Sequence, residues 1–362
     1  MPTSNYSKQH PTTCCRMLRT IKDSVRNKIN RRDVYYVVEG ANWSIDHDGR
    51  SITASLSGVS AAVVTTCRGI RNGIVHFGSV NTFLNNDGPK LPHRSNKIIV
   101  TWFHISPGDK RVEFIPQAVK YVDLWHTACN ITRNKLIKFG VPEEKIIVIP
   151  LGVNLNAFSI PTRQQRENIR LKFGISKAKV VVGSFQKDGN GWGEGLEPKL
   201  IKGPDVFCDV IEKLHRHYDL FVLLTGPARG YVKQRLERSG IPYLHRFLNS
   251  PDEVARYYKA LDFYIATGRV EGGPKAVLES LASGVPLVST KAGMAPDIII
   301  DGENGFLCDV DGVDQIVQKS MMILEDEEKK ERIVANGLVT AHQFDWNVIA
   351  QRYKNCLYRR LL

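Results

Sequence analysis

The chain lacks the apolar runs and the cysteine spacings that mark membrane-spanning, zinc-binding and disulfide-stapled proteins. Its longest apolar stretches, such as 220–224, have the length of a buried strand, whereas a spanning helix needs ~18 residues. The seven cysteines are scattered with no CxxC spacing, which excludes a zinc ribbon, argues against a disulfide framework and favours a reducing cytosol. The first ten residues, MPTSNYSKQH, lack the apolar core of a secretion signal. We therefore expect a cytoplasmic protein.

The 362 residues are 42% hydrophobic and 24% charged, which is the balance of a globular chain. This length predicts two or three domains. The net charge of +13 is uneven, because residues 1–155 hold 21 Lys and Arg against 11 Asp and Glu, and the rest of the chain holds 29 against 26. The first part therefore either faces an anionic partner (nucleic acid, phospholipid or a phosphorylated substrate) or carries basic residues for solubility.

Residues 1–32 stand apart as a basic amino-terminal arm. Apolar residues recur there at helical spacing, with basic residues around them. The apolar set is Leu18, Ile21, Val25 and Ile29, and the basic set is Arg16, Arg19, Lys22, Arg26 and Lys28. Such a helix can lie on an anionic bilayer surface. The alternatives are a helix packed on its own domain and a mobile arm.

From residue 34 onward, short β-branched runs alternate with helical stretches, the pattern of doubly wound α/β domains. The predicted strands of the first half are 34–40, 60–67, 73–79, 96–104, 122–129 and 145–153. The second half repeats the plan, with strands 179–185, 220–226, 242–248, 261–267, 285–290 and 305–310 and helices near 204–217, 229–239, 251–260, 274–283 and 312–324. Residues 154–178 are the predicted linker. We expect two Rossmann-like domains that face each other across a cleft.

The segment EGGPKAVLESLASGVP, residues 271–286, carries the strongest site pattern. Gly272 and Gly273 allow a ligand to approach the backbone closely, and Pro274 suits the first position of the following helix. The unpaired N–H groups of that helix favour a phosphate. Glu271 in the loop and Glu279 in the helix are spaced to bind two sets of sugar hydroxyls with a diphosphate between them.

This E-x7-E element, followed by a helix of small residues and GVPLV, resembles the retaining GT-B glycosyltransferases of family 4 (glycosyl transferases group 1). Other segments resemble the same family: 141–158, LIKGPD at 200–205, 292–310 and 342–358. The resemblance extends from about residue 96 to 358. It implies a first domain of residues 33–158 plus 344–362, which faces the acceptor, and a donor domain of residues 159–343.

The resemblance also implies roles for single residues. Glu271 would contact the donor sugar, and Glu279 the nucleotide ribose. Backbone N–H groups around Gly273 and Lys275 would hold the donor diphosphate, and Lys202 would neutralise the leaving phosphate. His104, at the end of a predicted strand, would face the cleft and contact the donor sugar or the acceptor.

Two features depart from the family pattern or remain open. The family commonly has Arg after the glycine that ends its first donor-domain strand, but Ser184 follows Gly183 here. Lys187 is the candidate substitute, and the Gly-rich insertion at 188–195 is either a mobile flap over the donor or an ordinary surface loop. His76 is a weaker candidate of the same kind as His104.

Two Asp-x-Asp triplets, Asp46 to Asp48 and Asp309 to Asp311, are interpreted as turn residues rather than as ligands of a divalent metal. We expect no metal and no cofactor beyond the donor itself.

The sequence therefore predicts an enzyme that moves a sugar from a nucleotide-diphosphate sugar to a glycan or lipid-linked acceptor, with retention of configuration and without a metal. It would be cytoplasmic, with a peripheral site on the inner membrane face, and it would not bind nucleic acid. A GT-B sugar-nucleotide epimerase and a non-catalytic anion-binding protein are the alternatives.

Overall fold

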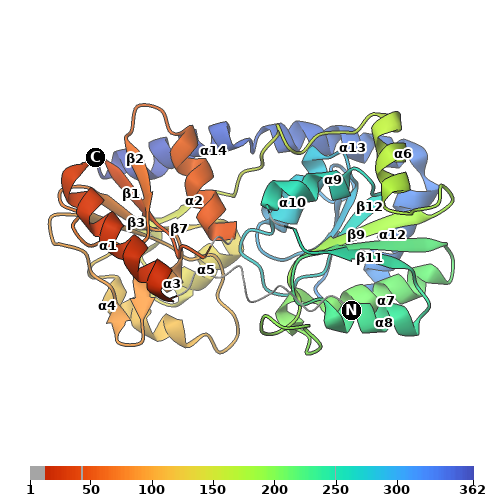
Figure 1. Cartoon of the computed structure of the whole chain (residues 1–362), viewed down its shortest axis with the longest axis horizontal. Helices are drawn as coiled ribbons and strands as arrows, with labels where there is room; N and C mark the ends of the chain where they lie inside the picture. Colours follow the sequence, from red (N-terminus) through yellow and green to blue (C-terminus); the bar gives the residue numbers. More distant parts are fainter. Residues whose placement is uncertain (1–12, 42–43, 249) are drawn as a thin grey trace. The chain divides into compact units, whose positions relative to one another are not determined.

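The computed structural model describes residues 13–41, 44–248 and 250–362, and the side chains of residues 13–17 are not part of that description. The chain divides into two compact units (Figure 1). The first comprises the chain up to Gly152 together with Trp346–Leu362, and the second comprises Val153–Asp345. Each unit is an α/β domain built on its own parallel sheet.

The first unit has a sheet in the order β2-β1-β3-β6-β7-β8 in the described part of the chain. Its strands are β1 Val34–Val37, β2 Ala61–Val64, β3 Ile74–Phe77, β6 Lys97–Thr101, β7 Leu124–Thr127 and β8 Ile146–Val148, and all pair in parallel. Its helices are α1 Thr13–Ile29, α2 Ser44–Ser55, α3 Val80–Phe83, α4 Ile115–Ala118, α5 Asn130–Lys138 and α14 Trp346–Arg352, and β4 Leu84–Asn85 pairs with β5 Gly88–Pro89. Strands buried on both faces explain the near-continuous apolar runs.

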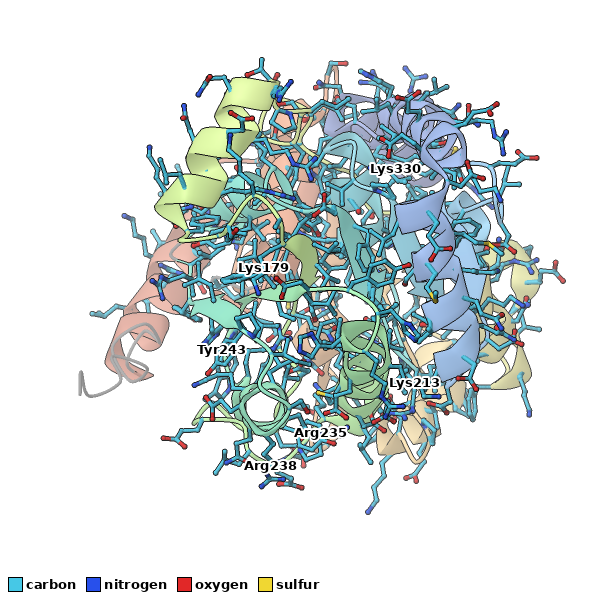
Figure 2. The ribbon with its side chains drawn as sticks, turned by 90° about the vertical axis from the view of Figure 1, so that its right-hand side faces the viewer. Lys179, Lys213, Arg235, Arg238, Tyr243 and Lys330 are labelled. Carbon is cyan, nitrogen blue, oxygen red and sulfur yellow. The ribbon has the colours of Figure 1, made fainter. Side chains whose placement is uncertain are left out.

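The second unit repeats this architecture with the order β11-β10-β9-β12-β13-β14. Its strands are β9 Val180–Phe185, β10 Leu220–Thr225, β11 Tyr243–Arg246, β12 Phe263–Ala266, β13 Leu287–Thr290 and β14 Phe306–Cys308. Its helices are α6 Arg163–Lys172, α7 Pro204–His215, α8 Gly230–Arg238, α9 Ala255–Tyr258, α10 Lys275–Ala282, α11 Ala295–Ile298, α12 Val313–Glu325 and α13 Glu327–His342. Arg235 of α8 donates to Glu212 and Asp209 of α7, and Figure 2 labels Arg235 among the side chains of this unit.

The predicted linker, residues 154–178, is largely an element of the second unit. It contains α6, whose Arg166 and Arg170 each donate to Asp262 at 2.6 and 2.7 Å. Val153, the residue before this segment, also belongs to the second unit, and its N–H donates to the Phe344 carbonyl at 2.9 Å. The boundary between the units therefore falls at Gly152 and Val153 rather than at residue 158.

A chain of buried hydrogen bonds ties the carboxyl-terminal segment to the first sheet. The His126 Nε2 lies 3.0 Å from the Ile149 carbonyl, which can only accept, so Nε2 carries the proton. The protons then run in one direction: Tyr358 donates to His76 Nδ1 at 2.9 Å, His76 Nε2 to Thr101 at 2.8 Å, and Thr101 to His126 Nδ1 at 2.9 Å. Both histidines are neutral in this arrangement.

This network predicts acid sensitivity. Burial lowers the pKa of His126 to about 4, and burial together with His126 holds the pKa of His76 well below its usual range. Because the unfolded chain binds these protons near pH 6.5, stability is lost as the pH falls from about 6.5 towards 4. A tenfold change in proton affinity corresponds to about 1.4 kcal/mol, so we expect His126 to contribute on the order of 2–3 kcal/mol to this loss.

Urea unfolding of the wild type and of His126→Gln, each at pH 7 and pH 5, checks this prediction. Carboxylates titrate equally in both proteins, so the wild type should lose more stability than the variant between the two values of pH. Equal losses would contradict a neutral, buried His126.

Candidate functional site

The Lys-Gly-Pro turn before α7 has no room for a side chain at Gly203. Gly203 has a φ of 64°, and a Cβ on it would lie 1.9 Å from the Thr267 carbonyl oxygen. The Thr267 hydroxyl in turn donates to the Gly203 carbonyl at 2.7 Å. The turn is therefore pressed against the end of β12, which carries the next loop of the site.

This close approach brings Lys202 to Glu271, although 69 residues separate them along the chain. The Lys202 Nζ lies 2.7 Å from both carboxylate oxygens of Glu271. The Lys202 side chain is 26% exposed and that of Glu271 is 14% exposed. A ligand can therefore reach a cation and a carboxylate at one point.

Arg269 clamps the same turn from the other side. Its guanidinium donates to both carboxylate oxygens of Asp205 at 2.8 and 2.7 Å, to the Leu200 carbonyl at 2.6 Å and to Asp311 at 2.6 Å. Its backbone N–H donates to the Ile201 carbonyl at 2.9 Å. The bidentate geometry fixes the turn relative to α7 and the β12–α10 loop.

The Gly-Gly loop leads into α10 much as predicted, with one difference at its start. Pro274 is the residue before the helix, with a ψ of 102°, and Lys275 is the first helical residue. No side chain caps this helix end, and a helix start favours a bound anion through its N–H groups and its dipole. Gly293 approaches closely as well, since a Cβ on it would lie 2.6 Å from the Gly272 carbonyl oxygen.

Glu279 lies on α10 beside a buried tyrosine. The Tyr258 hydroxyl donates to Glu279 Oε2 at 3.1 Å, and burial together with Glu279 holds the pKa of Tyr258 well above its usual range. Tyr258 also packs edge-on against Phe185 at the end of β9, with ring centroids 4.9 Å apart. Tyr258, at the end of α9, therefore orients the Glu279 carboxylate.

Three lysines converge near the end of β9. The pKa of Lys187 is lowered mainly by burial and also by the positive charge of Lys199. The pKa of Lys199 is lowered mainly by burial and also by the positive charge of Lys202. The Lys187 Nζ lies 3.7 Å from the centroid of the Trp192 ring, a cation–π contact that holds it against the insertion. Lys199 did not emerge from the sequence, although it stands three residues before Lys202. The cluster supplies positive charge next to Glu271.

The insertion at 188–195 is anchored along part of its length. The Gly230 N–H donates to the Glu194 carbonyl at 2.7 Å, and the Tyr231 N–H to the Gly195 carbonyl at 2.9 Å. A Cβ on Gly195 would lie 2.3 Å from the Ala228 backbone. Gly189 and Gly195 thus serve a close backbone contact with the β10–α8 loop, whereas Gly191 and Gly193 have open space around them.

An arginine that the sequence pattern did not single out lies beside Ser184, the residue that stands where the family commonly has arginine. Arg229 reaches Ser184 from the start of α8, and its guanidinium donates to the Ser184 carbonyl at 2.6 Å and to the Ser184 hydroxyl at 3.1 Å. It also lies 2.9 Å from Asp188, and both side chains are buried. Arg229 is thus held inside the domain, whereas Lys187 is partly exposed.

The two histidine candidates both belong to the first unit and have different surroundings. His76 is fully buried in the hydrogen-bond chain described above, so its cleft-facing interpretation is wrong. His104 lies beyond β6, which ends at Thr101, and its carbonyl accepts from Trp102 Nε1 at 3.1 Å.

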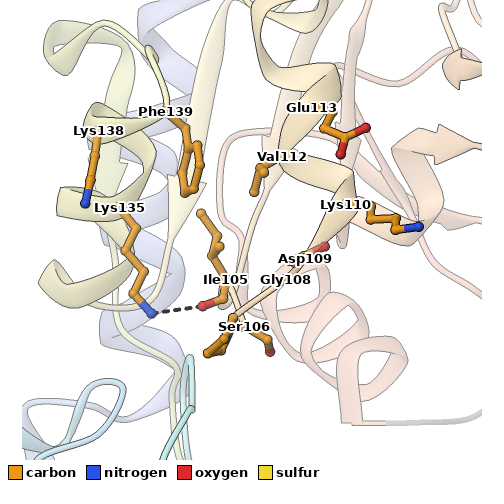
Figure 3. Close-up of a pocket in the computed structure, with 11 residues that line it drawn as sticks. Ile105, Ser106, Gly108, Asp109, Lys110, Val112, Glu113, Lys135, Lys138 and Phe139 are labelled. Carbon is orange, nitrogen blue, oxygen red and sulfur yellow. Dashed lines mark hydrogen bonds between the residues drawn. The ribbon is translucent and has the colours of Figure 1, made fainter.

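An open hollow of about 670 Å³ follows His104 along the chain (Figure 3). Its lining residues are Ile105, Ser106, Pro107, Gly108, Asp109, Lys110, Val112, Glu113, Lys135, Lys138 and Phe139. Lys135 Nζ donates to the Ile105 carbonyl at 2.9 Å across its floor. The hollow combines apolar walls with lysines at its edge.

The Asp-x-Asp triplets have structural partners. Asp46 and Asp48 are buried in α2 rather than in a turn, and Asp46 accepts from the Glu39 N–H at 3.1 Å. Asp309 pairs with Lys291 and Asp311 with Arg269 in the turn after β14. Within the described ranges, no group of three or more His, Cys, Asp or Glu side chains is arranged to hold a metal ion. The same residues include no helix that is long and apolar enough to cross a membrane.

Relatives of known name match somewhat more than half of the chain. The chain is 27% identical over 241 residues to the D-inositol 3-phosphate glycosyltransferase of Corynebacterium diphtheriae, covering 61% of this chain and 52% of the relative. It is 26% identical over 201 residues to the lipopolysaccharide core biosynthesis mannosyltransferase LpsB of Rhizobium meliloti, covering 53% and 54%. The chain thus spans about half the length of the curated relatives it matches.

Solved structures extend the similarity to both units. HepE of Anabaena in complex with UDP and glucose matches with a TM-score of 0.70 at 17% identity, over 90% of this chain and 99% of that one. Sucrose-phosphate synthase of Thermosynechococcus elongatus matches with a TM-score of 0.62 at 15% identity, over 80% and 73%. Residues 196–339 match the family described as "Glycosyl transferases group 1". The chain therefore has the two-domain GT-B fold, and the range that matches the glycosyl transferases group 1 family includes Lys202, Glu271 and α10.

Proposed function

We propose that this protein is a glycosyltransferase that takes its sugar from a nucleotide-diphosphate sugar. The observation that carries the proposal is the meeting of Lys202 with Glu271 at 2.7 Å beside the uncapped start of α10. A diphosphate sugar has an anion next to a ring of hydroxyls, and the site offers a cation and N–H groups next to a carboxylate. The relatives and HepE, which was solved with UDP-glucose, support the same class of donor.

The chemistry that such a site performs follows from charge. Breaking the bond between the anomeric carbon and the phosphate oxygen leaves a positive sugar centre and an extra charge on the diphosphate. Lys202, Lys187 and Lys199 together with the α10 N–H groups would stabilise the diphosphate in fixed positions, which is preorganised electrostatic catalysis. Glu271 would orient the sugar through its hydroxyls.

We propose that configuration is retained through attack on the same face of the sugar. The acceptor oxygen bonds to the anomeric carbon as the phosphate oxygen leaves with the bonding pair, and the acceptor proton passes to that phosphate oxygen. No protein nucleophile takes part in this scheme. Excluding water from the site would prevent hydrolysis of the donor.

We propose a glycan or lipid-linked acceptor and a cytoplasmic location with peripheral contact to the inner membrane face. The hollow in the first unit supports an amphipathic acceptor, because Lys110, Lys135 and Lys138 edge a wall that contains Val112 and Phe139 (Figure 3). The net positive charge of residues 1–155 supports contact with an anionic membrane surface.

A screen of nucleotide sugars by thermal unfolding tests the donor class. A bound donor should raise the melting temperature with increasing concentration, and UDP sugars are the first to try. Release of the nucleotide should then require an acceptor. Release without an acceptor, together with a changed sugar epimer, would support the epimerase, and the absence of any response to nucleotide sugars would contradict the proposal.

Glu279→Ala should weaken binding of the free nucleoside diphosphate by about 10- to 100-fold. The variant removes a charged acceptor for ribose hydroxyls, and such a bond contributes about 1.5–3 kcal/mol. Isothermal titration calorimetry measures the change. Glu328→Ala, on the exposed first turn of α13, is the matched control and should bind normally. Unchanged affinity in Glu279→Ala would refute the ribose assignment.

Turnover should persist in excess EDTA, because lysines and helix N–H groups supply the positive charge in this scheme. The measurement is the rate of nucleotide release after dialysis against the chelator. Loss of the rate in EDTA, with recovery on adding magnesium or manganese, would show that a divalent ion takes part.

A further inference from the structure

The amino-terminal helix α1 docks on the first unit through its polar side. Asp23 and Asn27 are buried, at 7% and 3% exposure. The Asp23 carboxylate accepts from the Thr65 N–H at 2.8 Å and from the Thr65 hydroxyl at 2.9 Å. The Asn27 amide donates to the Thr66 and Arg68 carbonyls at 3.2 and 3.1 Å. The loop after β2 therefore holds this helix by hydrogen bonds.

The apolar side of α1 points away from the domain. Leu18, Ile21, Val25 and Ile29 are 61%, 54%, 53% and 73% exposed. A helix on a soluble domain normally buries its apolar stripe and exposes its polar one. In α1 the arrangement is reversed, and a continuous row of aliphatic side chains faces outward without a covering element among the described residues.

Basic side chains frame this row. At 100° per residue, Lys22 lies on one side of the apolar stripe and Lys28 on the other, and both are exposed. Arg26 is also exposed and donates to the Val63 carbonyl at 3.0 Å. Asp23 is the sole acidic residue of α1, and its carboxylate is turned inward. The outward side of α1 is therefore apolar at its centre and positive at its margins.

We propose that α1 is an interfacial membrane helix that inserts its apolar row among the acyl chains of an anionic lipid surface. Lys22 and Lys28 would reach the phosphate groups while their aliphatic stems remain at the apolar boundary. The charge pattern commits the proposal to lipid rather than to a second protein copy, since a self-complementary dimer would bring the lysines of two α1 helices together. Asp23 and Asn27 would orient the first unit on the surface through the loop after β2.

This inference deepens the membrane location proposed with the function, and it is tested without any measurement of sugar transfer. The full chain is sedimented with vesicles of phosphatidylcholine alone or with phosphatidylglycerol added. Binding is expected with the anionic vesicles at low salt, and it should weaken as salt is raised. Sugar transfer to a soluble acceptor is measured separately, so that either proposal can fail alone.

The deciding variant is Ile21→Asp/Val25→Asp, which we expect to lower the partition onto anionic vesicles by roughly tenfold or more. Its matched control is Leu171→Asp/Val339→Asp, which alters two aliphatic residues on α6 and α13 that are at least as exposed as Ile21 and Val25. The control should bind like the wild type. Because all four side chains are exposed, circular dichroism should show unchanged folding.

A charge variant, Lys22→Glu/Lys28→Glu, should bind anionic vesicles at least fivefold less and lose most of the salt dependence. The inference is overturned if the full chain stays in the supernatant with anionic vesicles at low salt, or if Ile21→Asp/Val25→Asp binds like the wild type. Sedimentation equilibrium without lipid gives a further check. A dimer that dissociates in that variant would assign the apolar row to a second copy of the chain instead.

Discussion

Lys202→Met is expected to lower the turnover number by about 100- to 1,000-fold while leaving the fold intact. The Lys202 ammonium lies 2.7 Å from Glu271 in a partly buried site, and in the proposed reaction it faces the leaving diphosphate. Removing one preorganised donor or cation of this kind costs about 3–4 kcal/mol in the transition state. The fall should appear mainly in kcat, because charge on the diphosphate grows as the bond breaks.

Lys213→Met is the matched control for this experiment. Lys213 lies on α7, close in sequence to Lys202, and pairs with Asp314 at the surface (Figure 2). Exposed ion pairs of this kind contribute little, so the control should turn over at the wild-type rate. A Lys202→Met enzyme within about twofold of the wild type would remove Lys202 from the chemistry. The turnover numbers of Lys187→Met and Lys199→Met then show how much each of these lysines contributes to stabilising the diphosphate.

Arg229→Met is expected to destabilise the second unit by about 3–5 kcal/mol, because it leaves Asp188 buried without its cation. The guanidinium also donates to the carbonyls of Ser184, Gln186 and Thr225, so the variant strands several acceptors at once. Burial already raises the pKa of Asp188 even with Arg229 present. Without Arg229 the carboxyl should take up a proton or draw in water, and either outcome costs free energy.

Thermal or urea unfolding measures this change. Arg238→Met, at the exposed end of α8 (Figure 2), should leave stability within about 0.5 kcal/mol of the wild type. The double variant Arg229→Met/Asp188→Asn should recover part of the loss, because it removes the stranded charge. If Arg229→Met unfolds like the wild type, the pair contributes no net stability, and Arg229 is then free to be considered as a ligand of the donor.

Local patterns in the chain were sufficient to predict the elements of both sheets. Runs such as 220–226 and 285–290 contain β10 and β13, because a strand covered on both faces needs apolar residues at every position. The predicted ends were less accurate. The run 96–104 extends beyond β6, which stops at Thr101, because an apolar residue such as Trp102 can be buried in a loop as well as in a strand.

Sequence patterns did not identify residues whose role depends on a contact with a residue distant in the sequence. Arg229 and Tyr258 stand in ordinary helical surroundings in the sequence, and nothing local shows that one reaches Ser184 and the other Glu279. Lys199 had a weak signal, as a second lysine in PKLIKG. His76 shows the opposite error, because a histidine in a strand reads the same in the sequence whether its ring is buried or exposed.

The sequence by itself determined two α/β domains, the Gly-Gly loop before α10 and the Lys-Gly-Pro turn before α7, because each depends on periodicity or on a backbone conformation encoded within a few residues. Tertiary structure alone decided that the two loops meet, since Gly203 must touch Thr267 for Lys202 to reach Glu271. The same division holds for α1. Its spacing predicts an apolar stripe and a polar one, but hydrogen bonds from Asp23 and Asn27 to the loop after β2 decide which stripe faces outward.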